Sequence, residues 1–274
     1  MQKPTHIIRP TQRWYGLGFN ELLLYRELLL FFAWRDVKVR YQQTALGVMW
    51  VIIQPLLYGL AFSLIFGRLL GPQSNNIPYP LFCFAGLVIW NLFSTGVSLA
   101  SASVVSHGEL IQKVYFPRLI LPLSAVAIAL VDFSINLGAL FLLMAYYGVV
   151  PTIHLIFAPI LIIVAAGTAL GFGASLAALN VQYRDIRHIT PFLMQIWLLA
   201  TPVAYPARLI SSDWSILLAL NPMSGIVEGF RWAVLGTHAP NLHDAASSFA
   251  ISGLALFGGI LLFRRLQYRF ADII

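Results

Sequence analysis

Six long apolar stretches alternate with short polar segments along this chain of 274 residues. At 1.5 Å per residue, a helix of about 20 apolar residues crosses the ~30 Å hydrocarbon core of a bilayer. The pattern therefore predicts an all-α integral membrane protein with six membrane-spanning helices. The expected spans cover residues 46–66, 81–105, 119–147, 153–179, 189–205 and 249–263.

An amphipathic segment precedes the first expected span. Asn20 is a favourable helix cap, and the apolar residues that follow are interrupted by charges as far as Lys38. These charges exclude a span and favour a helix that lies in the cytoplasmic interface, with its basic groups near lipid phosphates. A helix packed on another subunit is the alternative. We expect residues 1–45 to form this cytoplasmic N-terminal segment and residues 46–274 to form the transmembrane domain.

A shorter helix is expected between the fifth and sixth spans. Asn221 and Pro222 form a favourable cap and first position, and Gly236 ends the helix. The segment is too short to cross a bilayer but apolar enough to dip into it, which requires protein or a water-filled cavity around its ends. Within this re-entrant segment, Glu228 and Arg231 lie one turn apart and are able to pair.

The basic residues are distributed unequally between the two sides of the membrane. With six spans, fourteen of the 17 Lys and Arg residues fall on one side, while Arg68, Arg208 and Arg231 fall on the other. The side richer in Lys and Arg is cytoplasmic. This places both termini and the loops 106–118 and 180–188 in the cytoplasm, and 67–79, 148–152 and 206–248 in the periplasm. Because the charges are spread over separate loops, they give no sign of a nucleic-acid surface.

Composition agrees with a membrane protein and argues against an enzyme. The chain is 59% hydrophobic and 10% charged, with a mean hydropathy of +0.80, whereas soluble proteins carry about 25% charged residues. Cys83 is the single cysteine, so an intrachain disulfide and a cysteine-based metal site are excluded. The sequence contains neither a GxxxxGK[ST] phosphate loop nor an HExxH motif. We therefore expect no cofactor in this chain and an energy source in another protein.

Asp132 is the one clear acid inside an expected span. An unpaired charge there costs about 2.5–3.5 kcal/mol, so a functional role has to be considered. A proton role, a hydrogen bond between helices and an acid facing a cavity all remain open. A proton-driven transporter normally has several such groups or paired broken helices, and an enzyme acting on lipid-linked sugars normally has paired carboxylates or a metal motif. Neither set is visible in the sequence.

Three stretches resemble the ABC-2 family of polysaccharide export permeases. They are residues 35–57 (RDVKVRYQQTALGVMWVIIQPLL), residues 109–124 (ELIQKVYFPRLILPLS), and the pair 183–186 (YRDI) with 221–231 (NPMSGIVEGFR). The resemblance implies a homodimer that works with two copies of a separate ATPase, where ATP and magnesium are bound. Its implied substrate is a polysaccharide attached to a polyprenyl-diphosphate lipid in the inner membrane of a Gram-negative bacterium.

The segment 197–206 (WLLATPVAYP) and the long N-terminal extension look more like O-antigen exporters than capsule exporters. Capsular polysaccharide and teichoic acid permeases remain the alternative, and an ABC-2 drug or lipid permease is a further one.

The sequence and the resemblance together suggest four groups of functional residues. A short helix that contacts the ATPase is expected at His107, Gly108, Glu109, Leu110, Gln112, Lys113 and Tyr115, with Ile111 and Val114 packed inward; a polar connector is the alternative. Contacts with membrane lipid and its diphosphate are expected from Arg35, Lys38 and Arg40. Channel aromatics are expected at Trp90, Phe93, Trp197 and Tyr205, although interfacial anchoring or packing also explains such residues. A periplasmic gate is expected at Asn221, Pro222, Glu228 and Arg231.

Overall fold

The computed structural model describes residues 19–42, 47–70, 77–207 and 215–270, and this part of the chain contains helices and no strand. Its α-helices are α1 Phe19–Leu24, α2 Arg26–Gln42, α3 Met49–Leu70, α4 Tyr79–Ser106, α5 Gly108–Lys113, α6 Ile120–Tyr147, α7 Ala158–Gln182, α8 Ile186–Ala200, α9 Ser215–Leu220, α10 Pro222–Leu235 and α11 Leu242–Leu266. Short 3₁₀ turns, η1 Ile153–Phe157 and η4 Gln267–Arg269, precede α7 and follow α11.

Four helical segments among the described residues are long and apolar enough to cross a membrane. They correspond to α4, α6, α7 with η1, and α11 with η4. α3 contributes a shorter apolar stretch, and α8 has 15 residues, or about 22 Å of helix. The chain thus has the architecture of a multi-span membrane protein, in which the first and fifth expected spans coincide with the two shorter helices.

Helix ends follow from local sequence in several places. α6 ends where Gly148 adopts a left-handed φ of 68°, a conformation that glycine adopts without steric cost. α8 stops at Ala200, earlier than the expected end at residue 205, because Pro202 disfavours helical backbone at the residue before it. α11 begins at Leu242, seven residues before the expected start, so its first turns are more polar than the pattern suggested.

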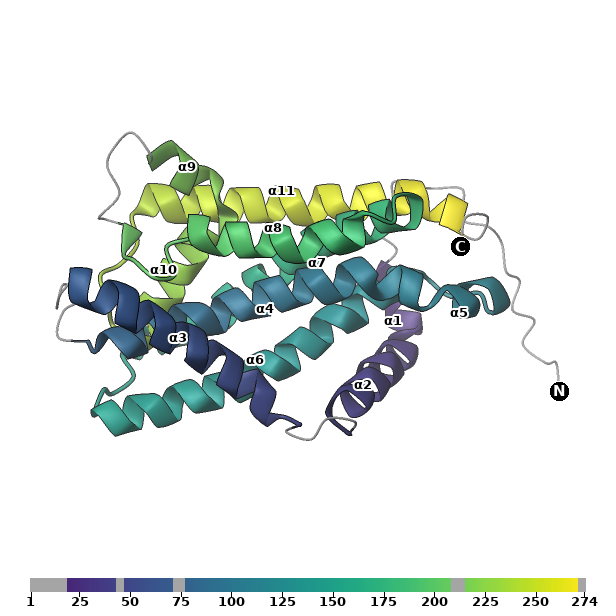
Figure 1. The fold of residues 1–274 in the computed structure, drawn as a ribbon. Helices are drawn as coiled ribbons and strands as arrows, with labels where there is room; N and C mark the ends of the chain where they lie inside the picture. The colour runs from purple at the N-terminus through teal and green to yellow at the C-terminus, as the bar shows by residue number, and fades with distance from the viewer. Residues whose placement is uncertain (1–18, 43–46, 71–76, 208–214, 271–274) are drawn as a thin grey trace.

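The long helices pack side by side along their length. In Figure 1, α4, α7 and α11 run in roughly the same direction, α6 runs obliquely below α4, and α3 crosses in front of α6. α7 and α11 approach closely at Gly171 and Gly259, where a Cβ on Gly259 would lie 2.0 Å from the Gly171 carbonyl oxygen. Small residues that let backbones touch are typical of helix packing in lipid, where the hydrophobic effect does not hold helices together.

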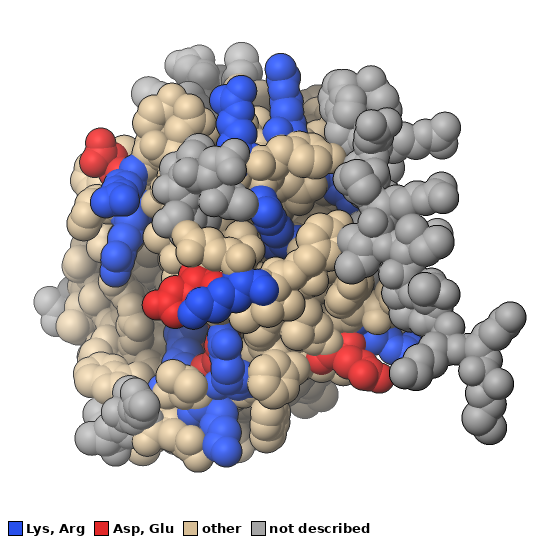
Figure 2. Space-filling view, turned by 90° about the vertical axis from the view of Figure 1, so that its right-hand side faces the viewer, with Lys and Arg blue, Asp and Glu red and all other residues tan. Residues whose placement is uncertain are grey.

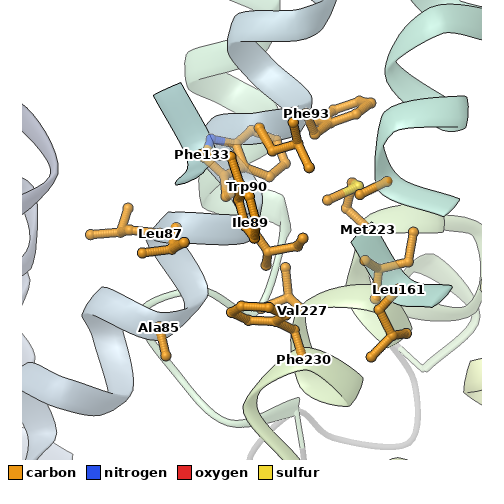
Figure 3. Close-up of a cluster of buried hydrophobic side chains, with 14 of the residues drawn as sticks. Ala85, Leu87, Ile89, Trp90, Phe93, Phe133, Leu161, Met223, Val227 and Phe230 are labelled. Atoms are coloured by element: carbon orange, nitrogen blue, oxygen red, sulfur yellow. The ribbon is translucent and has the colours of Figure 1, made fainter. Parts of the chain in front are cut away.

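α10 is buried within the bundle. Of its 14 residues, only Glu228 and Trp232 are not buried. Figure 3 shows Val227 and Phe230 beside Ile89 of α4, and Met223 beside Leu161 of α7. α10 is therefore packed mainly against protein, which is the surrounding that a short segment within a membrane would need.

The α2 helix differs from the expected amphipathic helix. Phe32 is buried, whereas Leu30, Phe31 and Trp34 are exposed on its other side. Apolar residues therefore occur on both sides of α2, so one apolar face is not its organising feature. Phe32 packs on Phe116, with their ring centroids 5.9 Å apart, which holds α2 against the segment that follows α5.

Charged residues gather at one end of the bundle. α5, the turn between α7 and α8, and the end of α11 lie together at this end in Figure 1. Figure 2 views the molecule from that side and shows many Lys and Arg side chains among apolar ones. These elements, the segment between α5 and α6 and the first turn of α8 contribute the basic residues Lys113, Arg118, Arg184, Arg187, Arg264, Arg265 and Arg269. α10 at the opposite end has one basic residue, Arg231, which is buried.

Candidate functional site, a polar cavity in the helix bundle

A cavity of about 360 Å³ lies among α2, α3, α4, α6 and α8. α4 contributes a polar stripe to its wall, made by Asn91, Ser94, Thr95 and Ser98. Residues three, four and seven positions apart lie on the same face of a helix, so α4 turns these amide and hydroxyl groups in one direction. The other polar residues in the wall are Arg40, Gln54, Tyr58, Asp132, Asn136 and Gln195.

An ion pair between Arg40 and Asp132 forms part of this wall. Arg40 Nη2 lies 3.0 Å from Asp132 Oδ2, and the Tyr41 hydroxyl donates to the other carboxylate oxygen. Burial, followed by the hydrogen bond with Asp132, raises the pKa of Tyr41, so the phenol keeps the proton that it donates. The sequence left open a proton role, a hydrogen bond between helices and a position facing a cavity for Asp132. The structure shows that Asp132 bonds to α2 and lines the cavity.

This pair fixes the C-terminal end of α2 against α6. Asp132 lies about 18 Å along α6 from its first residue, so the C-terminal end of α2 lies beside the middle of α6. A buried carboxylate needs a cation and hydrogen-bond donors, and Arg40 with Tyr41 supplies both.

The three basic residues expected at the lipid interface have different surroundings. Arg40 is paired with Asp132, and Arg35 Nη2 lies 2.7 Å from Asp36 Oδ1. Lys38 is exposed. Among the three, Lys38 is therefore the residue best placed to contact a group outside the chain.

α5 has the form expected for a short helix between two spans. It contains six residues, and His107 separates it from α4. Glu109 and Lys113 pair at 3.6 Å on its exposed side, and Gln112 and Tyr115 are exposed as well. Gly108 and Ile111 are buried, and Leu110 packs against the neighbouring core. The expectation for Val114 was wrong, because the chain becomes extended there and leaves this side chain exposed.

His107 joins α5 to α2. Its Nδ1 donates to the Ser103 carbonyl oxygen at 2.8 Å, which leaves Nε2 to accept from Arg35 Nη2 at 2.5 Å. The Phe32 ring lies against both side chains, with its centroid 5.9 Å from the His107 ring and 5.2 Å from Arg35 Cζ. α2 and α5 are thus held together by a polar bond and by packing.

The candidate channel aromatics belong mainly to a buried cluster. Phe93 contacts Trp90, Trp197 and Phe172, with ring centroids 5.0 to 6.1 Å apart. Trp90 and Phe93 are 2% and 0% exposed, so both are packing residues within the subunit, although Trp90 also reaches the cavity wall. Tyr205 lies apart from this cluster and donates its hydroxyl to the Leu199 carbonyl oxygen at 3.0 Å.

Asn221 caps α10 and fixes it to α8. Its side-chain oxygen accepts from the Met223 backbone at 3.0 Å and from Trp197 Nε1 at 2.9 Å, while its amide nitrogen donates to Thr201 Oγ1 at 2.9 Å. Pro222 occupies the first helical position and is buried. The expected cap is confirmed, and the tertiary bonds through Trp197 and Thr201 add to it.

Arg231 has partners other than the one expected. It is 1% exposed and donates to the Phe82 carbonyl oxygen at 3.0 Å, to that of Pro202 at 2.7 Å and to that of Val203. Its donor nitrogens are thus directed at backbone oxygens of α4 and of the turn after α8. Glu228 accepts from the Ala207 backbone nitrogen at 3.0 Å. Both side chains attach α10 to the turn after α8.

Sequence reasoning missed Tyr41, Asn136 as a cavity residue, and the contact between Phe32 and Phe116. The signal for the first was indirect, because a lone acid in a span predicts a buried partner without saying which residue it is. Tyr41 is 91 positions from Asp132. No local pattern connects residues at that separation.

These features describe a multi-span membrane protein with a polar cavity within its helix bundle and a short helix at its basic end. The sequence profile of the ABC-2 type transporter family matches residues 27–235. The chain belongs to this family, as a transmembrane subunit and not as the ATPase.

Individual relatives match over nearly the whole chain. It is 33% identical over 258 residues to the O-antigen export system permease protein RfbA of Myxococcus xanthus, covering 93% of this chain and 98% of the relative. It is 27% identical over 262 residues to the protein of the same name from Klebsiella pneumoniae, covering 95% and 98%. The polysialic acid transport protein KpsM of Escherichia coli is 23% identical over 237 residues, covering 84% and 87%.

Proposed function

We propose that this chain is the permease through which a lipid-linked O-antigen polysaccharide crosses the inner membrane, driven by a separate ATPase. The observation that carries the proposal is the 33% identity to the Myxococcus protein over 98% of that protein's length. The cavity supports it physically, because a row of hydroxyl and amide groups inside a membrane bundle suits a substrate rich in hydroxyl groups.

Export is tested in cells that lack this chain but still make the lipid-linked polymer. We expect the polymer to accumulate on the cytoplasmic side and to reach the surface again when the chain is restored with its ATPase. An ATPase without its phosphate-loop lysine provides the control and is expected to leave the polymer inside. Unchanged surface polymer in cells without the chain would reject the proposal in favour of a drug or lipid permease.

The proposed membrane arrangement has six spans, with α3 and α8 as the first and fifth, and both termini in the cytoplasm. The basic end of the bundle in Figure 2 supports this orientation. Cys83 is buried, so a cysteine introduced elsewhere is the reactive site for an impermeant thiol reagent. A cysteine at Ala239 is expected to react in whole cells, and one at Ser106 only after the cells are opened. The reverse pattern would invert the topology.

We assign α5 the role of the contact that transmits motion from the ATPase in a homodimer with two ATPase copies. Because α5 is short and is fixed by His107 and Ile111, it moves as one body with α4 and α2. Glu109→Lys tests the contact cleanly, since an exposed pair such as Glu109–Lys113 contributes only ~0–1 kcal/mol to folding. We expect the variant to fold and to lose ATPase association or export, with Glu109→Gln as the milder control. A variant that assembles and exports normally would exclude this role.

The α10 helix is proposed as part of the periplasmic gate, with Arg231 holding it against α4 and the turn after α8. Lys38 is the proposed contact to the lipid diphosphate, because its side chain is exposed beside the paired Arg35 and Arg40. Lys38→Gln is expected to weaken export while leaving the protein level unchanged, whereas an unaffected variant would remove Lys38 from this role.

A further inference from the structure

Two buried polar atoms in the cavity wall have no hydrogen-bond partner among the described residues. They are Arg40 Nη1, a donor, and Asn136 Oδ1, an acceptor. Buried polar groups are nearly always hydrogen-bonded, so each such exception calls for an explanation. Both residues line the same cavity, so rotation of either side chain would turn its unpaired atom toward a ligand bound there.

The rest of the polar wall is uncharged. It includes Gln54, Asn91, Thr95 and Gln195, and each of these side chains can both donate and accept hydrogen bonds. This combination suits hydroxyl groups, which also act in both ways. A cavity of about 360 Å³ falls in the size range of binding sites for small organic groups.

The charges of the cavity cancel. Arg40 and Asp132 are the charged groups of its wall, and they are already paired at 3.0 Å. An anionic ligand would gain little from a paired Arg40 and would be repelled by the Asp132 carboxylate, in surroundings of low dielectric where such repulsion is strong. Asp132 therefore has a second consequence beyond joining α2 to α6, because it removes the positive charge that a polyanion would need.

We infer that this cavity binds uncharged sugar units and that Asp132 makes it select neutral polysaccharide over polyanionic polysaccharide. The inference rests on the proposed export function and adds the charge class of the substrate. It assigns Asn136 as an acceptor for a sugar hydroxyl, Arg40 Nη1 as a donor to a sugar oxygen, and Asp132 as the residue that determines specificity.

Binding is measured on the purified permease with its ATPase in nanodiscs, using two probes of equal length: a linear mannose oligosaccharide and an oligosialic acid, whose every unit carries a carboxylate. We expect the mannose probe to bind at least tenfold more tightly than the sialic acid probe. Asn136→Leu should weaken mannose binding about tenfold, the effect of one lost hydrogen bond. Ser134→Ala is the matched control, because Ser134 is exposed on the same helix and bonds to the Leu130 backbone.

Asp132→Asn tests the charge argument directly. The amide keeps the size of the side chain, and it can accept from Arg40 through its oxygen while its nitrogen donates to the Tyr41 hydroxyl oxygen, but it leaves the guanidinium charge unbalanced. We expect the ratio of mannose to sialic acid affinity to fall at least tenfold, mainly through tighter binding of the anion. Gln195→Leu, which removes a neutral group, should weaken the mannose probe without improving the anionic one.

The outcomes separate this inference from the proposed function. If the parent protein exports polymer in cells but binds both probes equally, or if Asp132→Asn leaves their ratio unchanged, charge selection by this cavity is rejected. The same holds if Asn136→Leu binds the mannose probe like the parent, because the cavity would then hold only water. Failure of the parent to export any polysaccharide would instead overturn the proposed function.

Discussion

Gly86 leaves the space that the guanidinium of Arg231 occupies. A Cβ at this position would lie 2.2 Å from Nη2 and 2.9 Å from Cζ of Arg231. Gly86→Ala therefore requires the guanidinium to move by about 1.2 Å before it reaches the ordinary contact distance of 3.4 Å. The Arg231 side chain has little freedom to move, because it is 1% exposed and its Cζ lies 3.8 Å from the centroid of the Phe82 ring.

The size of the effect follows from the bonds that this displacement disturbs. Bonds of 3.0 Å to the Phe82 carbonyl and 2.7 Å to that of Pro202 would be stretched beyond useful length. A hydrogen bond to a charged group contributes about 1.5–3 kcal/mol, and a buried charge left without partners costs ~3–5 kcal/mol. The higher helix propensity of alanine offsets about 1 kcal/mol of this loss in the free energy of unfolding. We expect a net loss of ~2–4 kcal/mol in the free energy of unfolding.

The assay is thermal unfolding of the detergent-purified protein, together with protein level in the membrane. Gly138→Ala on α6 is the control, because a Cβ there meets nothing within 4 Å, and it should be neutral or slightly stabilising. Combining Gly86→Ala with Arg231→Met distinguishes the mechanism. Once the guanidinium is gone, the added methyl group should cost little, so the two effects should not add. Additive losses would refute the proposed contact between these residues.

Three further outcomes are expected. Gly259→Ala places a Cβ 2.0 Å from the backbone of α7 and should destabilise the protein by about 1–3 kcal/mol. Gly258→Ala is the control, because a Cβ there meets open space and should not destabilise the protein. Equal unfolding temperatures of the two variants would contradict the close crossing of α7 and α11. Trp197→Phe removes the bond to Asn221 and should cost ~1 kcal/mol, detected as faster hydrogen exchange in α10, while Trp232→Phe serves as the comparison. Phe32→Ala should cost ~3–5 kcal/mol and loosen the N-terminal half of α2, so faster exchange confined to that half is expected. An unchanged α2 would show that the polar bonds of Arg35, Arg40 and Tyr41 are sufficient to hold it.

Hydropathy was sufficient to locate the bundle. The long helices α4, α6 and α7 lie within a few residues of the stretches expected at 81–105, 119–147 and 153–179. The thickness of the bilayer sets the length of each apolar stretch, so the spans can be recognised from local composition. The start of α10 at Asn221-Pro222 and its end at Gly236 were equally readable, because helix caps depend on residues close in sequence.

Local pattern did not identify which faces of these helices meet. A span that is apolar on every side gives no periodic signal to separate lipid-facing positions from buried ones. For this reason Trp90 and Phe93 were equally compatible with a channel and with packing until the helices were assembled. The exposure of Val114 was missed for a related reason, since it depends on where the chain leaves α5 and becomes extended.

The polar partners were decided by tertiary structure alone. The sequence singled out Asp132 as a charge that needs an explanation and predicted Glu228 as a partner for Arg231. In the structure, Arg40 reaches Asp132 from another helix, and Arg231 donates to the carbonyls of Phe82 and Pro202. Every residue carries a backbone carbonyl oxygen, so a sequence does not indicate which of these oxygens accepts a hydrogen bond from Arg231. The cavity likewise combines side chains from five helices. The sequence therefore determined the long apolar helices and the caps of α10, while the crossing of helices decided which buried charges are neutralised and where the polar cavity lies.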